Sequence, residues 1–128
     1  MSNQGFGTAV NCMDGRVQEA VSSWMRERYQ VQWIDTITEA GPVAALARGD
    51  ESILAGIRFR ADISIQAHES VGMCVAGHEG CAGMPPDLTH DDEIAITLSA
   101  AKVLRECYPQ LPVAALWVGL DGSVTVLD

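Results

Sequence analysis

The sequence predicts an α/β fold with three layers, in which helices cover both faces of a mostly parallel β-sheet. Short apolar runs typical of strands alternate with longer segments whose apolar residues recur at helical spacing. No linker, repeat or low-complexity stretch interrupts this alternation. The chain has 128 residues, of which 48% are hydrophobic. A chain of this size can bury one core, so residues 1–128 are expected to form a single domain.

The first part of the chain alternates between strand and helix. Residues 7–12 form a short apolar run, and residues 31–37 alternate between apolar and polar positions, so both are predicted to be strands. Helical spacing of apolar residues predicts helices over residues 16–29 and 50–68. Asp50 and Glu51 suit the positive end of the second helix. Residues 38–42, which include Gly41-Pro42, are expected to form a loop.

The second part repeats the pattern and ends in a hairpin. Residues 71–76 are nearly uncharged, as in a strand buried on both faces. A helix is expected from about residues 89–92, where Thr89 or Asp91 can cap it, to Cys107. Residues 113–118 form the fourth predicted strand. Asp121-Gly122 is a hairpin signal that leads into an antiparallel edge strand over residues 124–127. The predicted order is therefore βαβαβαββ.

Composition excludes several classes of function. The net charge is −9 and Lys102 is the only lysine, which argues against binding to nucleic acid or to anionic membranes. No run approaches the ~18 apolar residues of a membrane span, and the first residues lack the features of a signal peptide. A cytoplasmic location is therefore expected. In that reducing compartment the four cysteines are expected to be metal ligands, reactive thiols or core residues, not disulfides.

Two short motifs carry the chemistry. Cys12-Met13-Asp14-Gly15-Arg16 follows the first predicted strand, and His78-Glu79-Gly80-Cys81 follows the third. Ligands of such sheets bind beyond the carboxyl ends of the strands, so both motifs are expected at one edge. Two thiolates and an imidazole are three of the four ligands that tetrahedral Zn²⁺ prefers, and a three-ligand site leaves a position for water or substrate. Cys12, His78 and Cys81 are therefore predicted to bind zinc.

The neighbouring charges suggest how such a site would react. Zinc lowers the pKa of bound water from ~15.7 toward ~7 and so supplies hydroxide for attack on an electrophilic carbon. Asp14 is predicted to orient that hydroxide, and Arg16 to keep the Asp14 carboxylate ionised and off the metal through a charge-assisted pair. If that pair breaks, Asp14 could instead become a fourth zinc ligand and close the site. The sequence leaves both states open.

Other interpretations are open as well. Cys12 could be a nucleophile above an oxyanion cradle, as in thiol phosphatases and sulfur transferases. Those loops place the arginine six residues after the cysteine, whereas here the separation is four and Asp14 intervenes. A non-catalytic zinc-binding protein is a third reading. The remaining candidates are expected to be core residues (Cys74, Cys107, Trp24, Met25, Trp33) or surface and capping histidines, either of which could instead relay protons (His68, His90).

The pair of motifs resembles the β-class carbonic anhydrases, whose patterns are Cys-x-Asp-x-Arg and His-x-x-Cys at these places. The resemblance implies a zinc lyase that hydrates CO₂ to bicarbonate, with Cys12, His78 and Cys81 on zinc and Asp14 with Arg16 as the dyad. Relatives with the same site hydrolyse carbon disulfide or carbonyl sulfide, which the ligands alone cannot distinguish.

The resemblance has departures and one further implication. Thr38-Glu39-Ala40-Gly41 stands where the family commonly has Arg-Asn-Ala-Gly, and Cys81 is followed by Ala82-Gly83 where the family has Cys-Gly. The chain begins close to the first predicted strand, so a compact member without the family's N-terminal helical arm is expected. Members build their substrate pocket between subunits. A homodimer or larger assembly is therefore expected, with the apolar loops at residues 38–46 and 82–88 covered by the partner.

Overall fold

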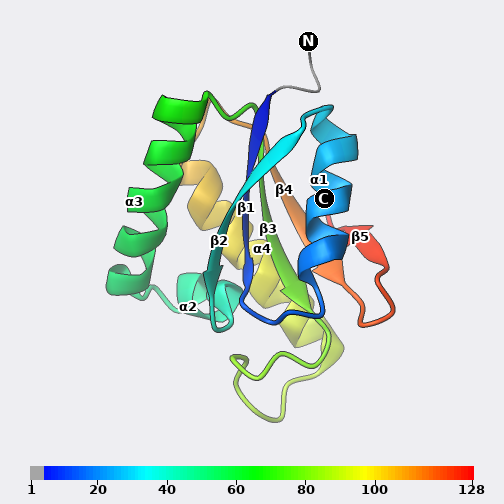
Figure 1. Ribbon diagram of the computed structural model, residues 1–128. Helices are drawn as coiled ribbons and strands as arrows, with labels where there is room; N and C mark the ends of the chain where they lie inside the picture. Colours follow the sequence, from blue (N-terminus) through cyan, green and yellow to red (C-terminus); the bar gives the residue numbers. More distant parts are fainter. Residues whose placement is uncertain (1–4) are drawn as a thin grey trace.

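One five-stranded sheet runs through the computed structural model, which describes residues 5–128. The strand order is β2-β1-β3-β4-β5 (Figure 1). The strands are β1 (Phe6–Cys12), β2 (Trp33–Glu39), β3 (Met73–His78), β4 (Val113–Val118) and β5 (Val124–Val126). The first four are parallel, whereas β5 pairs antiparallel with β4. The predicted parallel sheet with a closing antiparallel hairpin is confirmed.

Helices cover both faces of this sheet, which confirms the three-layer architecture (Figure 1). The helices are α1 (Gln18–Tyr29), α2 (Pro42–Ala47), α3 (Glu51–His68) and α4 (His90–Cys107). Alternate residues of β1 point to opposite faces, so Ala9 packs in a cluster with Val21 of α1. Val10 packs on the other face with residues of α2, α3 and α4. The core therefore lies on both sides of the central strands.

The two long helices begin at the expected capping residues. The Asp50 side chain accepts a hydrogen bond from the Ile53 backbone N–H at 3.0 Å. Thr89 accepts one from the backbone N–H of Asp92 while the Asp92 carboxylate accepts one from the Thr89 N–H, which forms a capping box. These caps satisfy backbone donors that a helix start leaves free.

Three local expectations about β2 and the segment after it were wrong. The segment after β2 is not only a loop, because Pro42–Ala47 forms the short helix α2. Pro42 occupies its first turn, where a missing N–H costs nothing. Strand β2 begins two residues later than predicted, at Trp33. Trp33 is 51% exposed at the edge of the sheet and is not a core residue.

The first of the two apolar loops beside the motifs is already covered within the subunit, and the second is covered only in part. Pro42 to Leu46 are buried, and Met84 in the segment after Cys81 is buried as well. Helix α2 packs against α4, which supplies much of this cover. The expectation that a partner subunit must cover these loops is therefore wrong for residues 41–46, which the chain's own helices bury, whereas Ala82, Pro85 and Pro86 of the second loop stay exposed.

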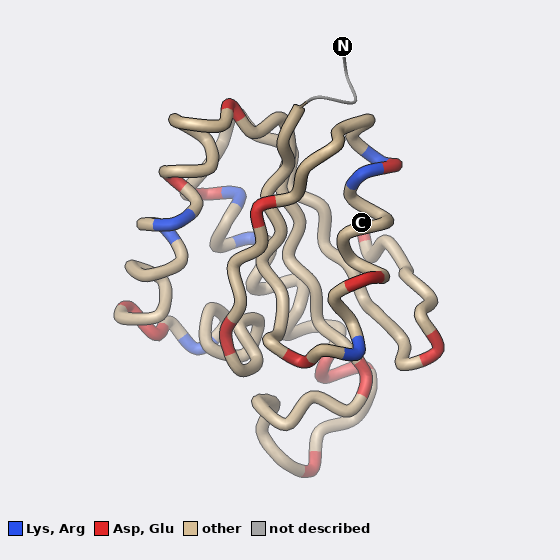
Figure 2. The backbone as a smooth tube through the Cα atoms, viewed as in Figure 1, with Lys and Arg blue, Asp and Glu red and all other residues tan. Residues whose placement is uncertain are grey.

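Charge and hydropathy of the described residues agree with the composition. Figure 2 shows the basic residues spread over α1, α3 and α4, interspersed with acidic ones. Across residues 5–128, none of the helices combines the length and the apolar character that crossing a bilayer requires.

Candidate metal centre

The two motifs lie at the same edge of the sheet. Strands β1 and β3 are parallel neighbours, so their carboxyl ends point the same way. Cys12 is the last residue of β1 and His78 the last residue of β3, where it pairs with Val118 of β4. Cys81 follows in the segment that leads to α4. The sequence placed His78 in a loop, but its backbone still belongs to the strand.

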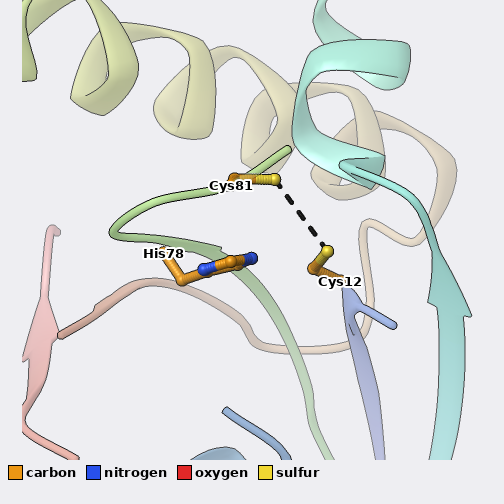
Figure 3. A group of neighbouring side chains, drawn as sticks. All are labelled: Cys12, His78 and Cys81. Atoms are coloured by element: carbon orange, nitrogen blue, oxygen red, sulfur yellow. Dashed lines mark hydrogen bonds between the residues drawn. The ribbon is translucent and has the colours of Figure 1, made fainter. Parts of the chain in front are cut away.

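The three predicted ligands come together (Figure 3). The Sγ atoms of Cys12 and Cys81 are 3.9 Å apart. Each residue offers one ligand atom, and these atoms all lie within 4.8 Å of one another. Two sulfur atoms at ~2.3 Å from a tetrahedral ion would be about 3.8 Å apart. The observed spacing of the two thiols therefore fits a tetrahedral zinc ion.

The imidazole of His78 presents an unpaired nitrogen to this group. Its Nδ1 lies 2.7 Å from the carbonyl oxygen of Glu79. A carbonyl only accepts hydrogen bonds, so Nδ1 carries the proton and Nε2 has a free lone pair. The ring is 1% exposed, and Nε2 has no hydrogen-bond partner. A buried lone pair without a partner is costly, and a metal ion between the thiols would satisfy it.

Asp14 and Arg16 form an ion pair in the turn after Cys12. Arg16 Nη2 donates to Asp14 Oδ2 at 2.7 Å, and Nε donates to Oδ1 at 3.0 Å. The backbone N–H of Arg16 also donates to Oδ1, at 2.9 Å. The Arg16 side-chain hydrogen bonds hold the pKa of the Asp14 carboxyl well below its usual range, with smaller contributions from the Arg16 backbone N–H and from His78. Asp14 is therefore an ionised carboxylate within electrostatic reach of the ligand group.

A comparison with protein families decides the chain's relationship. The family described as "Putative carbonic anhydrase" matches residues 2–128. The chain belongs to this family. No curated protein sequence matches the chain.

Solved structures of carbonic anhydrases share the fold. They include the β-carbonic anhydrase CcaA (17% identity, TM-score 0.56, covering 98% of this chain and 81% of that chain). CafA of the fungal pathogen Aspergillus fumigatus has 13% identity and a TM-score of 0.51, covering 98% of this chain and 76% of that chain. A tetrameric β-carbonic anhydrase from the filamentous ascomycete Sordaria macrospora has 13% identity and a TM-score of 0.56, covering 97% and 81%. At these identities the likeness establishes the fold alone.

In this member of the carbonic anhydrase family, two glycines hold the Cys81 segment against the end of β2. A Cβ atom on Gly41 would lie 2.8 Å from the backbone carbonyl of Gly83, and one on Gly83 would lie 2.7 Å from that of Ala40. Gly41 also has a φ of +64°. The two backbones therefore touch where side chains would separate them. Gly41 agrees with the glycine of the family's Arg-Asn-Ala-Gly stretch, whereas Gly83 stands one position later than the glycine of the family's Cys-Gly. Their contact was not predicted from the residues.

The same segment is tied to the β4–β5 hairpin of this carbonic anhydrase-family chain. The Leu120 backbone N–H donates to Glu79 Oε1 at 3.0 Å. Glu79 also interacts electrostatically with Arg16, whose pKa is raised first by its hydrogen bond to Asp14 and to a lesser extent by the charge of Glu79. Glu79 was not identified from the sequence as more than a spacer between His78 and Cys81.

The other candidates are not part of the ligand group. His68 bonds Asp35 through Nδ1 at 2.6 Å and stacks on Phe6, at the amino end of β1. This is the sheet edge opposite Cys12, which does not support a role in proton relay. His90 is exposed and contacts the ring of Trp117 edge-on. Cys74 is fully buried, and burial raises the pKa of its thiol to about 12, as expected for a core residue.

Proposed function

We propose that the chain is a zinc-dependent carbonic anhydrase that converts CO₂ and water to bicarbonate and a proton. The proposal rests on the convergence of Cys12 Sγ, Cys81 Sγ and the free Nε2 of His78 on one buried point. Three protein ligands leave the fourth tetrahedral position of zinc open, as in catalytic sites. Membership of the carbonic anhydrase family adds the reaction class.

The residues around the ligands have separate roles in this proposal. Zinc held by the three ligands would supply a water of lowered pKa as a nucleophile near neutral pH. Asp14 acts as a hydrogen-bond acceptor that orients the attacking oxygen toward the carbon. Arg16 fixes the Asp14 carboxylate in two parallel hydrogen bonds and keeps it ionised. The Glu79 carbonyl holds the His78 ring in the tautomer that leaves Nε2 free.

Two measurements on the purified protein test the proposal together. Metal analysis should find about one zinc ion per chain, and stopped-flow mixing with CO₂ should show hydration well above the uncatalysed rate. Zinc without hydration would indicate a non-catalytic zinc-binding protein. Absence of zinc would favour a thiol enzyme that uses Cys12. Hydrolysis of carbon disulfide or carbonyl sulfide without CO₂ hydration would change the substrate and keep the site.

The assembly that we propose is a homodimer or a larger homo-oligomer. Support comes from an apolar stripe on α3, here called the α3 stripe, whose residues recur every four positions and are all exposed (Ala55, Phe59, Ile63, Ala67). Phe59 is 69% exposed and Ile63 49%. Ion pairs of α3 with β2, such as Arg60 with Glu39, place this helix beside β2, which is an edge strand with open backbone groups. A two-fold contact would cover the stripe and the edge together.

We also propose that residues 1–128 are one zinc domain that works in the cytoplasm. Support for a single domain is the one sheet that joins the described strands. Support for a reducing compartment is that Cys12 and Cys81 are free thiols at ligand spacing, which zinc binding requires. Fractionation of the native cells with an antibody to the chain tests the location.

A further inference from the structure

The turn that joins Cys12 to Asp14 is held by the side chain of Gln18, the first residue of α1. Gln18 Nε2 donates to the carbonyl oxygen of Cys12 at 2.7 Å and to the carbonyl oxygen of Asp14 at 2.8 Å. One amide nitrogen therefore bridges the backbone of a predicted metal ligand and the backbone of the predicted catalytic carboxylate. Both N–H groups of the amide are used.

The orientation of this amide follows from its partners. Two carbonyl oxygens can only accept, so the NH₂ group of Gln18 must face them. Its Oε1 is then an acceptor, and Asn11 Nδ2 donates to it at 3.2 Å. Asn11 is the residue before Cys12 on β1 and is 1% exposed. A series of hydrogen bonds therefore connects the buried Asn11 on β1, through Gln18, to the turn.

Other contacts hold the turn at single points. The Met13 backbone N–H donates to the carbonyl oxygen of Glu39 at 2.8 Å, which fixes the turn to the end of β2. The Val17 N–H lies 3.4 Å from the Asp14 carbonyl oxygen, a long hydrogen bond. The Asp14 side chain is held by Arg16, which is itself 57% exposed. Gln18 is the group in this network that contacts both Cys12 and Asp14.

We propose that Gln18 is a positioning residue for the metal centre, which sets the place of Cys12 Sγ relative to the Asp14 carboxylate. The inference rests on the proposed function for the role of Asp14, but its effect on Cys12 concerns metal binding alone. The role needs two donors and one acceptor at the end of a two-carbon arm. Glutamate has the same shape, but a carboxylate oxygen would replace the NH₂ group. That oxygen has no hydrogen to donate and would face the two carbonyl oxygens. Alanine would leave the turn without its bridge.

The test compares Gln18→Glu and Gln18→Ala with the matched control Gln30→Ala. Gln30 follows the other end of α1 and its side chain bonds the Glu27 carbonyl oxygen, far along the helix from the turn. The measurements are the zinc dissociation constant by competition with a chelator, the absorption spectrum of the cobalt-loaded protein, and CO₂ hydration. Groups that orient metal ligands typically change affinity or activity ~10- to 100-fold when removed. We expect the zinc dissociation constant to rise by about that factor in both Gln18 variants and the cobalt–thiolate absorption bands to change. In Gln30→Ala we expect both to match the wild type.

A purely structural role for Gln18 predicts a different result. Urea unfolding of the metal-free proteins would then show a lower midpoint, while the folded variants would bind zinc with the wild-type constant and give the wild-type cobalt spectrum. That result overturns the inference. If Gln18→Ala fails to fold, the Gln18→Glu protein decides, because it keeps the shape of the side chain. If neither variant folds, Gln18 is required for folding itself, and that result also overturns the inference.

The connection to Asn11 gives a second check. If Asn11 acts by orienting the Gln18 amide, Asn11→Leu should weaken zinc binding in the wild-type background and add little in the Gln18→Ala background. Additive effects would contradict the proposed chain of contacts. A wild-type protein that binds zinc but does not hydrate CO₂ would refute the proposed function. The zinc constants and cobalt spectra would still test Gln18 in that case.

Discussion

The Nδ1 atom of His78 lies 2.7 Å from the carbonyl oxygen of Glu79, the next residue in the chain. Metal-binding histidines commonly donate their second nitrogen to an acceptor that fixes the ring. Here that acceptor is a backbone group, so no side-chain substitution removes it. The loop conformation itself selects the tautomer, and Gly80, with a φ of +69°, is part of that conformation. The orientation of this predicted ligand is thus a property of the loop.

Replacing a ligand cysteine should remove the metal. Cys12→Ser and Cys81→Ser should each lose most bound zinc, because a neutral hydroxyl replaces a thiolate. Atomic absorption on proteins purified in parallel measures this, and Cys107→Ser, at the far end of α4, serves as the control. Chelation of the wild-type protein should also lower its unfolding temperature, since bound metal stabilises the folded state. Full zinc occupancy in both ligand variants would refute the assignment.

Arg16→Ala should keep the metal and lose activity. The Arg16 side chain holds the Asp14 carboxylate but is not a ligand, so hydration should fall by ~10²-fold, the scale of one lost electrostatic contact. The pKa of Asp14 would return toward ~3.9, and the carboxylate would remain ionised at neutral pH. Raising the pH should therefore not restore the rate. Arg26→Ala on α1 is the matched control. Unchanged turnover in Arg16→Ala would remove Arg16 from the mechanism.

Gly83→Ala should weaken zinc binding by displacing Cys81. The new Cβ would lie 2.7 Å from the Ala40 carbonyl group, which is backbone and cannot rotate away. The two loops must therefore separate, and Cys81 lies in one of them. We expect the zinc dissociation constant to rise by ~10-fold or more. Gly56→Ala is the control, because its Cβ would meet only the end of the Arg60 side chain, at 3.5 Å. Equal zinc dissociation constants in Gly83→Ala and Gly56→Ala would mean that the close contact of Gly83 with Ala40 does not position Cys81.

Charges on the α3 stripe should break the assembly. The double variant Phe59→Asp, Ile63→Asp would place two carboxylates in the proposed two-fold contact, where they lose hydration and repel their copies. Light scattering should give a mass near the chain mass of 13.7 kDa for this variant and a multiple of that mass for the wild type. Val126→Asp, at the exposed β5 edge, is the control. If Val126→Asp dissociates the assembly and the double variant does not, the interface lies at β5 and not at the α3 stripe.

The Asp50 cap should make stability depend on pH. The hydrogen bond from the Ile53 backbone N–H, the largest cause, lowers the pKa of Asp50. A lowered folded-state pKa means that the contribution is present above the unfolded pKa of ~3.9 and is lost as pH falls through the folded value. Asp50→Asn keeps a capping oxygen without titrating. In urea unfolding of metal-free protein, wild type should therefore lose more stability than Asp50→Asn between pH 7 and pH 3. Equal losses of unfolding free energy in the two proteins would contradict a pH-dependent contribution from the Asp50 cap.

Much of the fold was predictable because its strands are short apolar runs with clear ends. The fourth strand, residues 113–118, has the predicted bounds, and Thr89 caps α4 as expected. Helix α2 was missed because Gly41-Pro42 is a turn signal as well as a helix start, and six residues are too few to show a period. Trp33 was misplaced because alternation identifies the two faces of a strand but does not say whether the strand lies at an edge.

Some features of the candidate site could likewise be predicted from the sequence, and others could not. The convergence of Cys12, His78 and Cys81 was predictable from residue type and spacing, since strand ends in a parallel sheet meet at one edge. Gln18, Gly41 and Gly83 were not, because their roles depend on backbone groups of segments distant in space or in sequence. A hydrogen bond to a carbonyl oxygen leaves no pattern of residue types along a single sequence. Such supporting contacts become visible only in three dimensions.

The spacing of the two thiols along the chain affects the order of folding and metal capture. Cys12 and Cys81 are separated by 69 positions, and between them lie α1, β2, α2, α3 and β3. Unlike the close-set ligand pairs of a zinc finger, these thiols meet only after β1 and β3 have paired across a long crossover. We therefore expect the metal-free chain to fold largely on its own, so that a zinc ion would enter a nearly folded protein. Once bound, such an ion would cross-link the first strand of the chain to the middle of the sheet.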